Sequence, residues 1–189
     1  IAQLNAALAN RQALPEAAFE DALTAAVSQN HVRALPLTRD AIAQMSLDKS
    51  MAFYRDRFAD ASDFTFVFVG SFDLATIKPL IERYLGSLPS LHRKEAGRDV
   101  GIRPPGDVVE TLVNKGTTPK SQVGVVFTGP FENNPKNRLI VRTMADTLAG
   151  NLQRVLREDL GGTYGVSVVP AFTKQPVEEY SISITFACN

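Results

Sequence analysis

A stretch rich in proline, glycine and basic residues divides the chain into two parts. The segment from Ser87 to Gly106 contains three prolines and three glycines, mixed with four basic side chains: Arg93, Lys94, Arg98 and Arg103. Proline removes a backbone donor and glycine costs conformational entropy, so neither a long helix nor a central strand fits here. We interpret residues 89–105 as a linker whose basic residues are solvated, rather than as a nucleic-acid-binding patch.

The first part of the chain has the apolar spacing of helices. Apolar residues recur at three- and four-residue intervals from Leu4 onward, and Pro15 is suited to the first turn of a second helix. Thr38, Ser46 and Asp73 each precede a further helical stretch and are suited to cap it. We therefore expect helices to make up most of residues 1–88.

One short segment of the first part has a different pattern. Residues 64–69, Phe-Thr-Phe-Val-Phe-Val, are all aromatic or β-branched, and Gly70 ends the run. Such a run is typical of a strand buried on both faces. We expect a central strand here. Because an apolar strand without its neighbours invites pairing with another chain, we also expect self-association.

The second part combines strand and helix patterns. Asn133 and Pro135 are suited to the cap and first turn of a long helix, which Gly161 and Gly162 end. The expected elements are strands at 108–113 and 122–128, a helix at 133–156, and strands at 163–172 and 180–187. The sequence thus predicts an α+β fold in which helices pack on a mostly antiparallel sheet.

Composition and charge exclude several classes of function. Lys+Arg and Asp+Glu both number 20, so no net field attracts nucleic acid or an anionic membrane. No apolar run approaches the roughly 18 residues that a membrane span needs. Cys188 is the only cysteine, so no internal disulfide can form.

The chain also lacks a recognisable metal or nucleophile site of its own. His31 and His92 are the only histidines, they are far apart in sequence, and no HExxH or HxxEH motif is present. No GxSxG motif occurs, and Cys188 is not flanked by a candidate base. We predict no metal-binding or cofactor-binding residue in this chain, and we interpret His31 as a helix-end histidine.

One pair of residues could contribute to catalysis. Arg157 lies in the last turn of the predicted long helix, and Tyr164 begins the next strand seven positions later. A guanidinium and a phenol are both hydrogen-bond donors, and donors aimed at a carbonyl can stabilise the oxyanion of acyl-transfer chemistry. The pattern also has a purely structural interpretation, because arginine favours helix C-termini and tyrosine favours strands.

Three segments resemble the pitrilysin/insulinase family of zinc metallopeptidases, in particular its bacterial periplasmic zinc proteases. They are FYRDRFADASDFTFVFVG from Phe53, KGTTPKSQ from Lys115 and LREDLGGTYGV from Leu156. They occur in the family's order, with the linker between the first and the second. The resemblance implies a fold of the LuxS/mitochondrial-processing-peptidase type and, by analogy, a periplasmic location.

The resemblance also implies how the chain is organised. Family members contain several homologous α/β domains, and residues 1–88 resemble the second half of one such domain. Residues 106–189 resemble the first half of the next, with the linker 89–105 between them. The chain begins at Ile1 without a methionine and ends at Asn189 directly after a predicted strand. We therefore expect a segment of a longer protein, from its C-terminal half.

Catalytic roles follow from the same resemblance. In the family an HxxEH motif in the first domain binds zinc, and an arginine and a tyrosine of the last domain hold the substrate backbone and stabilise the tetrahedral intermediate. These roles correspond to Arg157 and Tyr164. Zinc is then expected in the parent enzyme but outside this segment, which alone would be inactive.

The implied partners are a peptide or unfolded-protein substrate, together with the remaining parent domains or a zinc-bearing partner subunit. Two alternatives remain open: a non-catalytic partner or structural subunit of the same family, and a plain α+β interaction domain. Full burial of Tyr164 behind its sheet would favour the interaction domain.

Overall fold

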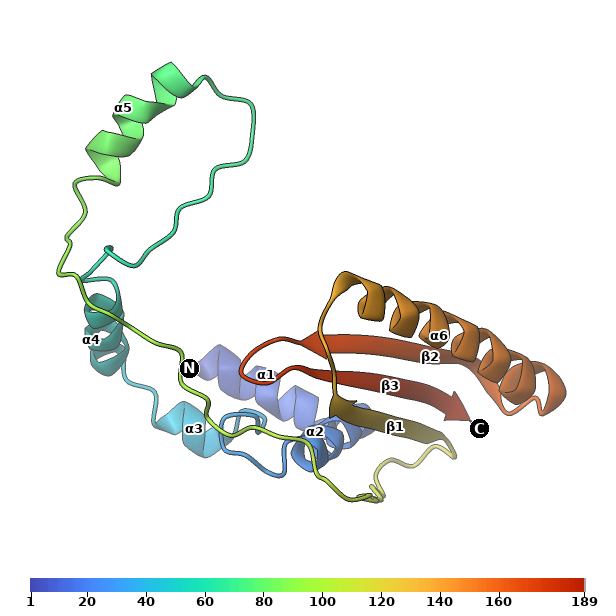
Figure 1. Ribbon diagram of the computed structural model, residues 1–189. Coiled ribbons are helices and arrows are strands. Elements are labelled where there is room, and N and C mark those ends of the chain that lie inside the picture. The colour runs from blue at the N-terminus through green and yellow to red at the C-terminus, as the bar shows by residue number, and fades with distance from the viewer. Residues whose placement is uncertain (189) are drawn as a thin grey trace. The chain divides into compact units, whose positions relative to one another are not determined.

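The computed structural model describes residues 1–188 and divides the chain into two compact units (Figure 1). One unit combines Ile1–Arg39 with the chain from Asp99 onward, and the other is Asp40–Arg98. Within the described residues, no helix is both long and apolar enough to cross a membrane. The assignment of residues 1–88 and 106–189 to two successive family domains stays a prediction.

A three-stranded antiparallel sheet forms the centre of the first unit. Its strands are β1 (Ser121–Pro130), β2 (Thr163–Thr173) and β3 (Glu179–Cys188), in the order β1-β3-β2. Ile184 on β3 is opposite both Val125 on β1 and Val168 on β2. The α+β class and the antiparallel sheet are confirmed, as are the two predicted strands nearest the C-terminus.

Helices cover both faces of this sheet. Helix α6 (Pro135–Gln153) packs along β2, and its Arg142 guanidinium lies 5.8 Å from the ring centre of Phe172. Phe172 shares a face with Ile182, which is buried in the core. Because side chains alternate along a strand, the predicted apolar face of β3 is the one beneath α6.

The opposite face is covered at β1 by the second helix of an N-terminal helix pair. Helices α1 (Ala2–Ala13) and α2 (Pro15–Val27) are linked by an Arg11–Asp21 ion pair of 2.6 Å. Helix α2 packs on β1, where a Cβ atom at Gly124 would lie 2.9 Å from the Phe19 ring. Glycine at position 124 therefore permits close approach of helix and strand.

The predicted cap of α6 is displaced by one residue. The side chain of Asn134, rather than Asn133, accepts the Asn137 N–H at 2.8 Å, and Pro135 follows in the first turn. The Asn133 amide instead donates to the Thr173 carbonyl at 3.2 Å. Adjacent asparagines are equivalent in a propensity argument, so only the tertiary bond to β2 distinguishes them.

Two predicted strands are not formed. Residues 64–69 and 108–113 have no strand pairing, and Val67, Val69, Val108 and Leu112 are exposed. The second part therefore begins with one strand rather than two. The sequence pattern describes side-chain preference, but a strand also needs a neighbour for its backbone groups, and neither segment has one within the described residues.

The regular structure of the second unit is helical, and the helices are short. They are α3 (Arg39–Ala43), which begins at the unit boundary, α4 (Leu47–Arg57) and α5 (Leu74–Tyr84). The predicted caps of α4 and α5 are confirmed, because Ser46 accepts the Lys49 N–H at 3.3 Å and Asp73 accepts the Thr76 N–H at 2.9 Å. Each cap satisfies a donor that the helix start leaves unpaired.

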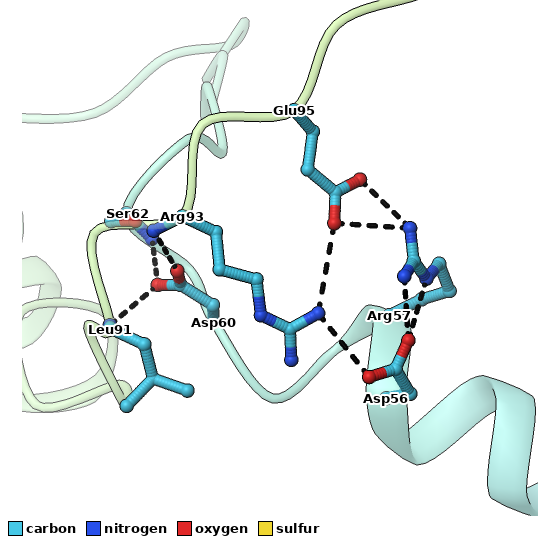
Figure 2. Close-up of polar contacts among 7 residues, drawn as sticks. All are labelled: Asp56, Arg57, Asp60, Ser62, Leu91, Arg93 and Glu95. Atoms are coloured by element: carbon cyan, nitrogen blue, oxygen red, sulfur yellow. Dashed lines mark hydrogen bonds and ion pairs between the residues drawn. The ribbon is translucent and has the colours of Figure 1, made fainter.

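A buried carboxylate fastens part of the predicted linker to the chain segment after α4 (Figure 2). Asp60, only 3% exposed, accepts backbone N–H groups from Ser62 at 3.0 Å, Leu91 at 2.8 Å and Arg93 at 2.7 Å. Burial alone raises the pKa of this carboxyl, but the hydrogen bonds from Arg93, Leu91 and Ser62 outweigh burial and hold its pKa well below the ordinary value.

Ion pairs surround this contact (Figure 2). Arg57 at the end of α4 pairs with Asp56 at 2.6 Å and with Glu95 at 3.0 Å, and Arg93 lies 3.4 Å from Asp56. Residues 91–95 lack regular structure but are anchored by charged and backbone contacts. Arg93, one of the four basic residues of the predicted linker, thus makes its ion pairs within the chain.

Candidate functional site

The helix that carries Arg157 ends in a widened turn. After Gln153, α6 continues as the π-helix η1 (Arg154–Asp159), in which the Leu160 N–H donates to the Val155 carbonyl at 3.1 Å. Gly161 then takes a left-handed conformation, with φ of 62°, and its N–H donates to the Arg157 carbonyl at 3.1 Å. Glycine tolerates this conformation, and π-turns within α-helices are frequent at functional sites.

Tyr164 lies in a β-bulge at the start of β2. Thr163 is opposite Cys188 and Val166 is opposite Phe186, so Tyr164 and Gly165 together face the single residue Ala187. A bulge of this kind bends the strand and redirects a side chain. The Tyr164 side chain is 84% exposed, which removes the condition that would have favoured a plain interaction domain.

The backbone of the bulge is held from two sides. The Thr163 hydroxyl donates to the Gly165 carbonyl at 3.1 Å, and its oxygen lies 3.3 Å from the Gly165 N–H, which donates to it. On the other side, the side-chain amide oxygen of Gln153 (Oε1) accepts the Val166 N–H at 3.1 Å. Helix α6 and strand β2 are thereby joined directly beside Tyr164.

Arg157 lies across the Gly161–Gly162 turn from Tyr164 and is exposed on the last turn of η1. Within residues 1–188 its guanidinium makes no side-chain hydrogen bond or ion pair, whereas the nearby Arg154 lies 3.3 Å from Asp159. The Tyr164 hydroxyl is likewise without a partner in the described chain. Two strong donors are therefore available to a ligand at this turn.

The histidines are used structurally or lie on the surface. The His31 ring accepts the Arg33 N–H at one nitrogen, at 3.2 Å, and donates from the other to the Val100 carbonyl at 2.9 Å. His92 is exposed. Across the residues that the structure describes, no three His, Cys, Asp or Glu side chains form a group able to hold a metal ion. The His, Cys, Asp and Glu side chains of the described residues therefore do not fit a zinc site.

Two hollows lie elsewhere in the first unit. One, of about 600 Å³, follows the outer face of α6 past Leu139, Ile140 and Met144. The other, of about 520 Å³, lies between α2, residues 102–104 and the sheet. Neither is lined by Arg157 or Tyr164, both of which are exposed at the turn between η1 and β2.

Sequence reasoning proposed Arg157 and Tyr164 as candidates but missed the residues that hold the backbone beside Tyr164. Gly165 directly after Tyr164 is a signal for a bulge, because glycine inside a strand pattern often marks one. Gln153 carries no comparable signal, since glutamine is common in helices and its contact with Val166 depends on how α6 meets β2.

Known proteins resemble this chain in sequence and in fold. The family model described as the Peptidase M16 inactive domain matches residues 44–188. The probable zinc protease PqqL of Haemophilus influenzae is 26% identical over 132 residues, covering 69% of this chain. The crystal structure of the periplasmic protease PqqL from Escherichia coli superposes over the whole chain with a TM-score of 0.80 and 24% identity, which shows a shared fold.

The chain is much shorter than either relative. It spans 14% of the Haemophilus protein and 21% of the Escherichia coli chain. The family model that matches residues 44–188 describes an inactive domain, and the sequence contains no HxxEH motif.

Proposed function

Because the chain belongs to the M16 peptidase family, also called the pitrilysin/insulinase family, we propose that it is the non-zinc-binding portion of a zinc metalloendopeptidase. In this role Arg157 and Tyr164 bind the substrate peptide and stabilise the oxyanion formed during hydrolysis. The zinc ligands lie outside this segment, in the parent chain or in a partner subunit, and the segment alone is inactive.

The observation that carries this proposal is the availability of two donors at one turn. The Tyr164 phenol is exposed on a bulge, and the Arg157 guanidinium is unpaired within the described residues. A phenol O–H and guanidinium N–H groups can donate to a carbonyl oxygen and bind it more strongly as negative charge develops there.

The relatives support a substrate class and a location for this proposal. A protease homologue supports a peptide or unfolded protein as substrate, and the Escherichia coli relative is described as periplasmic. We place the present protein in the periplasm on that basis. Its immediate partners would be the remaining domains of the parent or a zinc-bearing subunit.

The alternative function is a non-catalytic partner or structural subunit of the same family. It would use the surface around Arg157 and Tyr164 for binding alone. The match to the family's inactive domain is compatible with both functions, because an inactive domain can belong to an active parent. The two functions differ in whether the Tyr164 hydroxyl affects turnover.

Replacement of Tyr164 by phenylalanine in the parent protein tests this difference. Loss of one oxyanion donor lowers turnover by about a hundredfold or more. We expect Tyr164→Phe to reduce peptide hydrolysis to this extent while zinc content, measured by metal analysis, is unchanged. Tyr84→Phe is the matched control, since it removes the same hydroxyl from another exposed tyrosine. Near-normal turnover of Tyr164→Phe would contradict the catalytic role.

A further inference from the structure

We infer that Gln153 and Thr163 are positioning residues for Tyr164, because they fix the β-bulge that directs its side chain. The catalytic consequence of this inference rests on the proposed function, whereas the structural part does not. Neither residue reaches the substrate in this scheme. Both act through the backbone beside Tyr164, by hydrogen bonds to Gly165 and Val166.

The Gln153 side chain accepts a backbone hydrogen bond that a neighbouring strand would otherwise accept. In an antiparallel ladder, the backbone groups of successive residues point alternately toward one neighbour and the other. The Val166 N–H points to Gln153 rather than to β3, and β2 is an edge strand within the described sheet. Without the amide oxygen of Gln153, this N–H would have only water as an acceptor, and the end of the bulge would lose its bond to α6.

Thr163 closes the other side of the bulge. Its side chain is buried, with only 8% of the residue exposed, and its hydroxyl contacts both the N–H and the carbonyl of Gly165. These two contacts span Tyr164. They replace ladder bonds that a bulge leaves unmade. Thr163 and Gln153 therefore hold the two residues that follow the tyrosine, Gly165 and Val166.

The need for such support follows from the exposure of Tyr164. Its side chain is 84% exposed and makes no hydrogen bond among the described residues, so its direction depends on the backbone that carries it. Small misplacement of a catalytic donor costs rate, because the donor must meet the oxyanion in a narrow range of positions. Loosening the bulge should therefore lower kcat rather than weaken substrate binding.

The first test compares two replacements of Gln153 in the parent protein. Gln153→Met keeps the length of the side chain but loses the acceptor, whereas Gln153→Glu keeps an acceptor oxygen. We expect Gln153→Met to lower kcat by about tenfold with KM unchanged, the effect of losing roughly one hydrogen bond. Gln153→Glu should restore most of the activity. Thr163→Val and Thr163→Ser form a second pair with the same expected contrast.

The second test does not depend on activity. Amide hydrogen exchange, followed by mass spectrometry on peptides covering residues 163–167, reports directly on the bulge. We expect faster exchange in Gln153→Met and in Thr163→Val, and near wild-type exchange in Gln153→Glu and Thr163→Ser. Unchanged exchange in Gln153→Met and Thr163→Val would overturn the inference, whatever happens to turnover.

A double variant separates this inference from the proposed function. If Gln153 acts through Tyr164, Gln153→Met should lower kcat in the wild-type background but cause no further loss in Tyr164→Phe. An equal loss in both backgrounds would overturn the positioning role. If Tyr164→Phe itself has normal turnover while Gln153→Met speeds exchange, the proposed function fails and the structural role of Gln153 stands.

Discussion

At the scale of single residues, Asp60 shows how one carboxylate can hold a segment that has no regular structure. Its oxygens accept three backbone N–H groups, two of them from residues about thirty positions later in the chain (Figure 2). These donors would otherwise be satisfied only by water. The charge state of this one side chain therefore contributes to the order of residues 91–93, beside the ion pairs of Arg93.

This dependence predicts an acid-sensitive contribution to stability. The folded-state pKa of Asp60 lies below the unfolded-state value of about 4, so its contribution is complete above pH 4 and is lost as the pH falls toward the folded-state pKa. We expect Asp60→Asn to lower the urea midpoint of unfolding near neutral pH, and the difference from wild type to shrink as the pH falls below 4.

Asp63→Asn is the matched control for this prediction, because it removes an equal charge from an exposed side chain nearby. It should leave the urea midpoint close to that of wild type across the same pH range. A difference between Asp60→Asn and wild type that is constant with pH would show that the carboxylate charge is not what holds the segment.

At the scale of elements, two glycines of the first unit should respond in opposite directions to alanine. A Cβ at Gly124 would lie 2.9 Å from the Phe19 ring, so Gly124→Ala forces α2 away from β1 and should cost about 1–3 kcal/mol. Gly150 lies within α6 with no atom near the position of a Cβ. Gly150→Ala should therefore stabilise the unit by about 0.5–1 kcal/mol.

Thermal unfolding of the two variants measures both effects. We expect a lower midpoint for Gly124→Ala and a higher midpoint for Gly150→Ala than for wild type. A neutral Gly124→Ala would mean that α2 does not pack on β1 at the described distance. Because both variants replace a glycine by alanine, comparing them also controls for the lower conformational entropy of the unfolded chain.

Elements set by local interactions were predicted best. The caps Ser46 and Asp73 bind backbone groups three residues away, so their sequence signal is nearly complete. The strands at 163–172 and 180–187 also form, because they are close in sequence and pair with each other. Segments 64–69 and 108–113 have equally good strand composition but no partner within the described residues, and composition alone cannot reveal this.

In the candidate site as well, positions set by the local sequence could be predicted, whereas contacts between distant elements could not. The location of Arg157 at the helix exit and Tyr164 at the strand entry follows from the change of sequence pattern around Gly161 and Gly162, although their catalytic role stays a prediction. The π-turn, the bulge and the contact of Gln153 with Val166 depend on how α6 meets β2. Such contacts between distant elements are not encoded in local propensity.

At the scale of the whole molecule, the exposed segment 64–69 predicts self-association. Val67 and Val69 are 78% and 94% exposed, and the segment carries no charge and no strand partner within the described residues. Exposed apolar segments with free backbone groups pair readily with other chains. We expect this chain, expressed by itself, to form dimers or larger species in sedimentation experiments at high concentration.

A charge in the segment should prevent this association. Val69→Lys leaves folded contacts intact because the side chain is nearly fully exposed, and it should shift the chain toward monomer. Val32→Lys is the matched control, since Val32 is 80% exposed but lies in the other unit. A wild-type chain that remains a monodisperse monomer at high concentration would contradict the prediction.

The two margins of the sheet are not equivalent. On β2, the Val166 N–H is taken by Gln153, and Pro170, which lies on the same alternating set of residues, has no N–H to offer. On β1, residues 121–129 contain neither proline nor charge. Within the described residues, the β1 edge is therefore better suited than the β2 edge to pair with a further strand.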